Sequence, residues 1–382
     1  MLLPLSMRFF SLFFITVFLF TAIGHSKSDC RGIYVVRPKE HYRPAKDRYG
    51  ATRSNAPHFV AWAKKYMPQY FEGTLLHEGL ITVDAHLRNF ADLATSLGRK
   101  IGLIDYDDIG RGPYLLAIAK YFSSVDASPT PIKFKELWAL YIDGLKNQEQ
   151  PHIKMVEKAL AENTTKDIEK AERILERFTK NDKFSYEENR PRPIKDLNPE
   201  VQQEFSEIRS GLEKALAPYK ILDVAGYVKN GGGSRGQVRY WVLVNENGVN
   251  KIYEFKKLAE TSLSLWGSQE PASVRFAKTN AFYWGPDTQP YKVVETPAGE
   301  FQLSQRVKKR LDFEIDDPNN SDLKNIDTYH RWLARQQGIW HGRDAEYRDY
   351  ILKNEEVIRK QMKEFVRDYQ EVLKQLHRRS NR

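Results

Sequence analysis

Cysteine is almost absent from this chain, because Cys30 is the only one among 382 residues. An intramolecular disulfide is therefore excluded, and Cys30 is either a free thiol or a link to another molecule. Apart from His86, the histidines are scattered along the chain without the spacing of zinc ligands, so we assign them to surface or core. No internal repeat is present, and a repeat architecture is not expected.

Long apolar runs are also scarce. The one such run, at residues 9–20, follows Arg8 and precedes small residues at 22–26. A basic start, about a dozen apolar residues and small residues at a cleavage point are typical of a secretory signal peptide. The run is short for a membrane span, which needs about 20 residues. We therefore expect a signal peptide at 1–26, export to the periplasm or secretion, and no transmembrane span after it. An uncleaved N-terminal anchor is the alternative.

Positive charge exceeds negative charge by ten, and the isoelectric point is near 9.3. Basic proteins favour anionic partners such as phosphates, nucleic acids or membrane surfaces. The charge is dispersed here, with tight basic clusters only at 308–310 and 378–379, and no nucleic-acid reader motif is present. Specific nucleic-acid binding is therefore not expected.

Acidic and amide side chains gather in residues 80–113. Two apolar runs, 80–83 and 101–104, each end on acidic residues, which is typical of buried strands. About nine residues of linker separate the first part, which ends at Phe90, from the second, which begins at Lys100. We therefore expect a hairpin that brings five side chains together: Asp84, Asn89, Asp105, Asp107 and Asp108. Such an oxygen-rich cluster is what hard divalent cations prefer. The alternative is a hairpin whose acidic ends serve solubility.

The spacing within this stretch indicates a chemistry. Asn89 follows Asp84 by five residues, as in kinase catalytic loops, where the Asp orients the acceptor hydroxyl and the Asn binds magnesium. Asp105, at the end of the next strand, fits a second metal-binding carboxylate. The pattern Asp-x-His-x-x-Asn, then Ile-Asp-Tyr-Asp-Asp and Gly-x-Gly-Pro, resembles the aminoglycoside phosphotransferase branch of the kinase-like fold.

A second constellation lies about 145 residues later. The segment 230–236 is rich in glycine and joins two predicted strands, so its backbone N–H groups could cover phosphates. The candidate nucleotide-binding residues in it are Gly231, Gly233, Ser234 and Gly236. A flexible hairpin tip is the alternative. Lys256 and Lys257 follow on a strand, as in the upper lobe of a kinase. Strand alternation puts Lys257 on the face of Tyr253 and Phe255, and Lys256 on the other; we favour Lys257.

Periodicity predicts the remaining elements. Helices are expected at 57–71, 114–122, 132–145, 152–178, 198–217 and, as one long helix, 344–377. Asn198 is the expected N-cap of the fifth, followed by Pro199 in its first turn. Strands are expected across 219–260, with a hairpin turn at Asn247-Gly248, and at 281–284, 291–295 and 301–305. We predict a flexible mature N-terminus (27–56), a helical lobe with the catalytic-loop hairpin (57–218), a β-rich nucleotide-binding lobe (219–306) and C-terminal helices completing the helical lobe (307–382).

The fold class expected from this order is α+β, a protein-kinase-like two-lobed fold with a large helical lobe. The catalytic loop precedes the glycine-rich lobe, which is the reverse of the kinase order. Circular permutation allows such an order when the parent's termini lie close together.

The ordered motifs resemble those of the DUF2252 family, uncharacterised bacterial proteins related to kinase-like phosphotransferases. The resemblance spans about residues 57–375 and rests on five segments in the family's order. They are Val-Asp-Ala-His-Leu-Arg-Asn-Phe-Ala (83–91), Ile-Asp-Tyr-Asp-Asp (104–108), Gly-Pro-Tyr-Leu-Leu-Ala (112–117), Gly-Gly-Gly-Ser-Arg-Gly (231–236) and Lys-Lys-Leu-Ala (256–259). The resemblance implies the kinase-like fold and phosphotransfer.

The chain also departs from the family pattern. Ala117 replaces an Asp, Leu258 replaces the Glu that follows the strand Lys, and Gln337 replaces a His. Kinases pair the strand Lys with a Glu; Glu270 is the nearest candidate, although Arg275 occupies the more natural helical position. These departures are compatible with a divergent or inactive member that retains the metal and base residues.

The sequence therefore predicts a Mg²⁺- and ATP-dependent phosphotransferase with an unknown hydroxyl acceptor. In this hypothesis Asp84 orients the acceptor, Asn89 and Asp105 hold Mg²⁺, and Lys257 and the glycine-rich segment position the phosphates. Asp107 or Asp108 could bind a second metal, and His86 steadies the turn. Because ATP is scarce outside the cytoplasm, two alternatives stay open: a catalytically inactive kinase-like binding module of the cell envelope, and a metal-dependent phosphoesterase.

Overall fold

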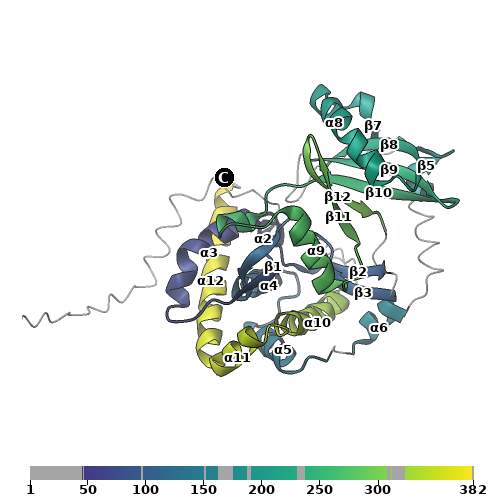
Figure 1. The fold of residues 1–382 in the computed structure, drawn as a ribbon. Coiled ribbons are helices and arrows are strands. Elements are labelled where there is room, and N and C mark those ends of the chain that lie inside the picture. The colour runs from purple at the N-terminus through teal and green to yellow at the C-terminus, as the bar shows by residue number, and fades with distance from the viewer. Residues whose placement is uncertain are drawn as a thin grey trace, which may run out of the picture. The chain divides into compact units, whose positions relative to one another are not determined.

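The computed structural model describes residue 45 and residues 47–95, 98–149, 152–161, 175–186, 191–229, 237–307, 311 and 323–380. The expected signal peptide, Cys30 and the glycine-rich segment with Gly231, Gly233, Ser234 and Gly236 lie outside these residues. The described part is an α+β structure with several sheets, as the sequence predicts (Figure 1). No helix in the described ranges combines the length and apolar character needed to cross a bilayer.

The largest sheet has six antiparallel strands in the order β11-β12-β10-β9-β8-β7. Their bounds are Arg192–Pro193 (β7), Lys220–Val228 (β8), Val238–Glu246 (β9), Val249–Lys257 (β10), Tyr291–Thr296 (β11) and Gly299–Gln305 (β12). Asn247 and Gly248 join β9 to β10 with φ of 53° and 87°. Two consecutive positive φ values are those of a tight hairpin turn, which confirms the predicted one.

Helix α8 (Pro199–Ala215) covers one face of this sheet. Asn198 caps its N-terminus, accepting a hydrogen bond from the Val201 backbone N–H at 3.0 Å, as predicted. The core beneath α8 is apolar and consists of Val201, Ile208, Leu212, Leu216, Tyr240, Val242, Val244, Phe255, Phe301 and Leu303. Strand alternation sends Trp241, Glu254 and Lys256 to the opposite face. One face is thus a packed core, and the other carries charge.

The helical part surrounds the predicted catalytic segments. Its helices are Arg48–Ser54 (α2), Ala56–Tyr70 (α3), Tyr114–Asp126 (α4), Phe134–Lys146 (α5), Lys154–Ala161 (α6), Ala272–Tyr283 (α9), Leu323–His341 (α10), Ala345–Lys353 (α11) and Glu355–Ser380 (α12). Phe365 and Tyr369 of α12 pack on Trp62 of α3, with ring centroids 4.6 and 5.0 Å apart. Helices α5 and α10 cross closely because Gly144 and Gly338 meet there; a Cβ on Gly144 would lie 2.0 Å from the Arg335 carbonyl oxygen.

The predicted hairpin between 80–83 and 101–104 is wrong. Strand β1 (Glu78–Thr82) pairs with β4 (Ile109–Pro113), whereas β3 (Gly98–Leu103) pairs with β2 (Phe90–Thr95). Residues 91–95, which belong to the expected linker, form a strand with Phe90 in which Phe90 and Leu93 are buried. The two acidic segments meet nevertheless, because two backbone hydrogen bonds join them: Ile104 N–H to the Asn89 carbonyl (2.8 Å) and Val83 N–H to the Asp108 carbonyl (3.1 Å).

Three further expectations need correction. Residues 281–284 were expected as a strand but end α9 and its cap, since a four-residue apolar run has no periodicity to separate strand from helix. The helix expected at 344–377 is broken at Asn354, which caps α11 with non-helical φ and ψ of −110° and 18°. Helix α2 lies within the N-terminal part that we expected to be flexible.

Short elements complete the described structure. They are the strands Thr179–Lys180 (β5) and Lys183–Phe184 (β6) and the 3₁₀ turns Leu87–Asn89 (η1), Ile194–Asp196 (η2) and Ser262–Leu265 (η3). Helices α3, α4 and α5, the strands β11 and β12, and the β9–β10 hairpin lie where the sequence predicts them.

Two buried histidines predict how the stability of this fold responds to acid. Burial lowers the pKa of His330 and of His341 to about 3. Below pH 6.5 the unfolded chain takes up a proton at each site and the folded chain does not, so stability is lost as the pH falls from 6.5 towards 3. Each histidine should contribute a slope of about 1.4 kcal/mol per pH unit in that window.

Urea unfolding at pH 7, 6, 5 and 4 measures this slope. The double variant His330→Gln/His341→Gln should show a shallower loss of unfolding free energy than the wild type, whatever its stability at pH 7. Parallel pH profiles for the two proteins would contradict the prediction.

Candidate functional site

The loop after β1 is a compact, internally bonded turn. The Asn89 side-chain N–H₂ donates to the Asp84 carbonyl oxygen (2.9 Å) and to Asp84 Oδ2 (2.7 Å). His86 begins the η1 turn, and its carbonyl accepts from the Asn89 N–H at 3.0 Å. Its buried ring lies 3.4 Å from Asp84 Oδ1, and burial lowers the pKa of His86. The structure thus brings the predicted Asp84 and Asn89 together and puts His86 in the turn that holds them.

The loop after β3 presents three carboxylates because Tyr106 anchors it. The buried Tyr106 hydroxyl donates to Asn280 Oδ1 (3.0 Å) and accepts from the Trp284 indole N–H (2.9 Å), which ties the loop to α9 and its C-cap. Asp108 Oδ1 accepts from the Ser262 backbone N–H at 2.8 Å. Burial and the nearby Asp84 raise the pKa of Asp108 to about 6. The carboxylates therefore stand in a fixed, crowded arrangement.

Lys256 of β10 joins this loop to the large sheet. Its side chain is 3% exposed, and its ammonium lies 2.5 Å from Asp107 Oδ2 and 3.3 Å from Asp105 Oδ1. Burial opposes ionisation of Lys256, but the two carboxylates outweigh it and raise the pKa of the ammonium. Burial alone would also raise the pKa of Asp105. The Lys256 ammonium outweighs this effect, so the pKa of Asp105 stays low. One ammonium is shared by two carboxylates.

Lys257, the lysine favoured from the sequence, lies on the opposite face of β10. Its ammonium is 2.5 Å from Glu204 Oε2 of α8 and is about half exposed. The expected partner Glu270 binds Lys278 instead, at 2.6 and 2.7 Å. Alternation along β10 places the two lysines on opposite faces of the sheet, but the sequence alone does not indicate which face α8 covers. Lys256 is therefore the lysine that belongs with the carboxylates.

The carboxylates have unmet capacity for a cation. Two carboxylates face the single Lys256 ammonium, which cannot neutralise both, and burial together with the adjacent Asp105 raises the pKa of Asp107. Among the described residues, the buried Asp107 Oδ1 has no hydrogen-bond partner, and Asp84 Oδ1 meets only the His86 ring, at 3.4 Å. The Asn89 N–H₂ is used on Asp84, which leaves its amide oxygen as the atom able to ligate a cation. Oxygen donors of this kind suit Mg²⁺. In the described ranges, however, no three His, Cys, Asp or Glu side chains form a ready-made metal site.

Lys120 is a site residue that the sequence analysis missed. It is the one charged residue in the apolar run 114–122 and is fully buried on α4, donating to the Thr52 carbonyl oxygen at 2.5 Å. Burial lowers the pKa of Lys120 to about 8, opposed by the carboxylates of Asp84 and Asp108. Burial acts to raise the pKa of Asp84, but His86 and Lys120 outweigh it and keep that pKa below its usual value. A lone lysine inside an apolar helix was the signal.

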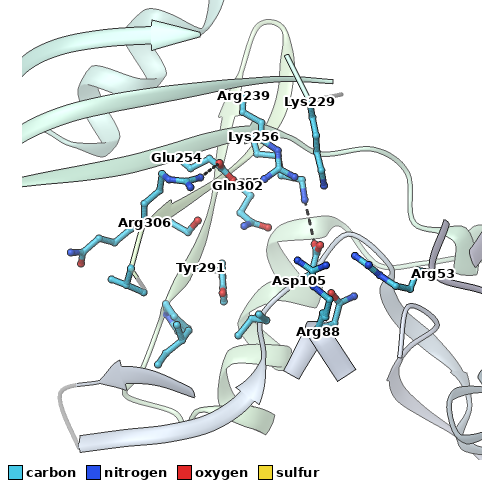
Figure 2. A pocket seen from close by; sticks show the side chains of 17 residues that line it. Arg53, Arg88, Asp105, Lys229, Arg239, Glu254, Lys256, Tyr291, Gln302 and Arg306 are labelled. Carbon is cyan, nitrogen blue, oxygen red and sulfur yellow. Dashed lines mark hydrogen bonds and ion pairs between the residues drawn. The ribbon is translucent and has the colours of Figure 1, made fainter. Parts of the chain in front are cut away.

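Two adjoining pockets contain these residues. The smaller, of about 170 Å³, is lined mainly by carboxylates, with His86 and Ser262 beside them. The carboxylates are Asp84, Asp105, Asp107, Asp108 and Glu260. The larger, of about 400 Å³, shares Arg53, Asn89, Asp105 and Lys229 with it and extends beneath the charged face of the sheet. Figure 2 shows Lys229, Arg239 and Lys256 pointing from the sheet toward Asp105, with Arg53 and Arg88 on the opposite side.

Glu254 organises the far side of the larger pocket. It accepts hydrogen bonds at 2.7 Å from both Arg239 and Arg306, and the Trp241 indole N–H donates to it at 3.2 Å. The Arg306 guanidinium lies 4.2 Å from the centre of the Trp241 ring. Burial acts to raise the pKa of Glu254, and Arg239 and Arg306 outweigh it. These contacts hold two guanidinium groups at the pocket in fixed orientations.

At the glycine-rich segment, the structure describes only the two flanking residues. Lys229 and Gln237, which flank residues 230–236, are joined by a backbone hydrogen bond of 3.0 Å and both line the smaller pocket. Residues 230–236 themselves lie outside the described ranges, so the roles assigned to Gly231, Gly233, Ser234 and Gly236 stay predictions.

Comparison of the chain with protein-family models, with curated proteins and with solved structures found no match. The resemblance described from its motifs therefore stays a prediction, and the function must be argued from the geometry of the site.

The shared ammonium makes a prediction about stability. Lys256→Met leaves two carboxylates facing each other, so the protein should lose about 1–2 kcal/mol of unfolding free energy at pH 7, a value discounted because both carboxylates are partly exposed. Mildly acidic pH should restore part of this, because protonating one carboxylate removes the repulsion. Urea unfolding at pH 7 and pH 5 measures both effects.

Lys257→Met is the matched control, since the adjacent lysine is exposed and pairs with a single glutamate. It should change unfolding by a few tenths of a kcal/mol at most. Equal losses of unfolding free energy in the two variants would show that the buried ion pairs of Lys256 contribute no more to stability than the exposed pair of Lys257.

Proposed function

We propose that this protein is a divalent-cation-dependent phosphotransferase of the kinase-like type, which transfers a phosphoryl group from a nucleoside triphosphate such as ATP to a hydroxyl acceptor. The observation that carries the proposal is the ion-paired triad of Asp105, Lys256 and Asp107, placed where a cationic pocket adjoins a carboxylate pocket. Phosphoryl transfer needs mainly positioning and neutralisation of charge, and both pockets supply groups for it.

The proposed roles follow from the contacts. Asp84 is the acceptor-side carboxylate, oriented by Asn89 and kept ionised by His86 and Lys120. It would accept the proton of the acceptor hydroxyl as that oxygen bonds to the γ-phosphorus. The bond between the γ-phosphorus and its bridging oxygen breaks, and the nucleoside diphosphate leaves.

The pocket cations would hold the phosphates through this step. Lys256 and Arg239 line the larger pocket, from which a phosphate chain would reach Asp105. Asn89, Asp105 and Asp107 would hold Mg²⁺, which supplies neutralisation of the phosphate oxygens when bound. The proposal includes the two-lobed fold and the permuted kinase order. The charged face of the large sheet, which opposes the Asp84–Asn89 loop, supports both.

A second candidate is a kinase-like binding module without turnover. It is favoured by Lys256, whose ammonium lies between the two carboxylates that the sequence assigns to metal. If that ammonium stays in place, the site binds an anion without a metal. The two candidates differ in one measurable property, the dependence of nucleotide binding on a divalent cation.

Thermal unfolding of the purified protein with ATP, with Mg²⁺ and with both tests the proposal. A ligand at 100 times its dissociation constant should stabilise the protein by about 2.7 kcal/mol. We expect stabilisation by Mg-ATP that Asp105→Asn abolishes and Lys257→Met preserves. Stabilisation by ATP alone, unchanged by Mg²⁺ and retained in Asp105→Asn, would favour the binding module; no stabilisation by any combination would reject both.

A turnover assay then separates enzyme from module. Slow release of phosphate from Mg-ATP in the absence of acceptor should fall at least a hundredfold in Asp84→Asn, because proton acceptance and orientation are lost together. A rate equal to that of the wild type would remove Asp84 from its role.

A further inference from the structure

The larger pocket carries an excess of fixed positive charge. Six cationic side chains line it against the two carboxylates of Asp105 and Glu254. The six are Arg53, Arg88, Lys229, Arg239, Lys256 and Arg306. The lining residues carry a balance of four positive charges around about 400 Å³, or three when the Asp107 carboxylate paired with Lys256 is included, and an uncharged ligand requires no such excess. It matches a ligand that carries several negative charges close together.

Lys229, Arg239 and Lys256 all point from the sheet toward Asp105, so several cations lie close together in this pocket (Figure 2). Burial and the nearby Arg239 lower the pKa of Lys229 to about 8, and Lys256 adds to this effect. Asp105 and Asp107 act in the opposite direction but do not cancel it. Like charges held close together repel one another, and a bound polyanion would offset this repulsion.

A buried amide also faces this pocket. Gln302 of β12 lines it, is 5% exposed, and its Oε1 has no hydrogen-bond partner within the part of the chain that the structure describes. Half a turn about the last side-chain bond exchanges the amide oxygen and N–H₂, so Gln302 can donate to a phosphate oxygen. It is an unsatisfied polar group that points to a ligand, independently of the charge count.

The same pocket offers little surface to a nucleobase. Its apolar lining residues are Leu93, Ile104, Pro290, Tyr291 and Val307. Leu93, Ile104 and Tyr291 are themselves buried, and the Tyr291 ring packs on Tyr106 with centroids 4.5 Å apart. Pockets for small organic ligands are usually lined mostly by apolar and aromatic groups, which would sandwich a planar base. Cationic side chains dominate here instead.

From the cation-lined pocket, the unsatisfied Gln302 and the sparse apolar lining, we infer that this site recognises a linear phosphate chain rather than a nucleobase. This inference rests on the proposed function and specifies its donor. Inorganic polyphosphate would serve as well as a nucleoside triphosphate. With tripolyphosphate, the acceptor oxygen bonds to the terminal phosphorus, the bridging P–O bond breaks, Asp84 takes the hydroxyl proton and pyrophosphate leaves.

Calorimetric titration of the full chain with tripolyphosphate, ATP and adenosine, each with Mg²⁺ at constant ionic strength, tests the inference. We expect dissociation constants for tripolyphosphate and ATP that agree within about threefold, and no heat from adenosine. Tripolyphosphate binding more than tenfold weaker than ATP binding, adenosine binding, or no binding of tripolyphosphate overturns it.

Charge variants supply the second arm. Lys229→Gln and Gln302→Leu should weaken tripolyphosphate and ATP by equal factors, about tenfold for the lysine. Lys257→Gln, on the same sheet but outside the pocket, should weaken neither. Unequal factors for the two ligands overturn the inference, because the base would then contribute to recognition.

Failure of the proposed function gives a different result. Equal binding of tripolyphosphate and ATP, without phosphate release from either, upholds the polyphosphate site and rejects the phosphotransferase. Turnover of ATP without binding of tripolyphosphate upholds the phosphotransferase and overturns the polyphosphate inference.

Discussion

The ion-paired triad of Asp105, Lys256 and Asp107 is the interaction on which the account of this site depends. It joins the large sheet to the loop that follows β3, and so fixes the position of the cationic pocket relative to the carboxylate pocket. The remaining contacts act in support: Tyr106 anchors the carboxylate loop to α9, and the Ile104–Asn89 hydrogen bond brings the second acidic segment to the first. A buried ammonium shared by two carboxylates leaves net negative charge, and that charge is what a divalent cation would meet.

Local sequence patterns predicted much of the fold and the outline of the site. The apolar periodicity of 57–71 and 132–145, the Asn198 cap and the Asn247-Gly248 turn each act over a few residues, and the structure contains the corresponding elements. Asp84 and Asn89 are near neighbours in the chain, so their association needs only one turn. These features depend on short-range backbone geometry, which the sequence expresses directly.

The features that could not be predicted depend on contacts between distant segments. Which strand pairs with β1 is decided by packing, and a two-strand hairpin was a reasonable but wrong choice. The choice between Lys256 and Lys257 depends on which face α8 covers, and alternation alone leaves that open. Arg53, Arg88 and Arg306 come from three separate parts of the chain, and no local pattern marks them as neighbours. Lys120 is the exception, since a charge within an apolar helix is visible in the sequence.

The most direct test of the account is a crystal structure of the protein with Mn²⁺ and a non-hydrolysable ATP analogue, using the anomalous signal of manganese. We expect an anomalous peak within coordination distance of Asp105, with Lys256 moved onto the phosphates and the phosphate chain in the cation-lined pocket. A structure in which Lys256 still bridges Asp105 and Asp107, with no manganese beside them and the analogue bound elsewhere, would contradict it.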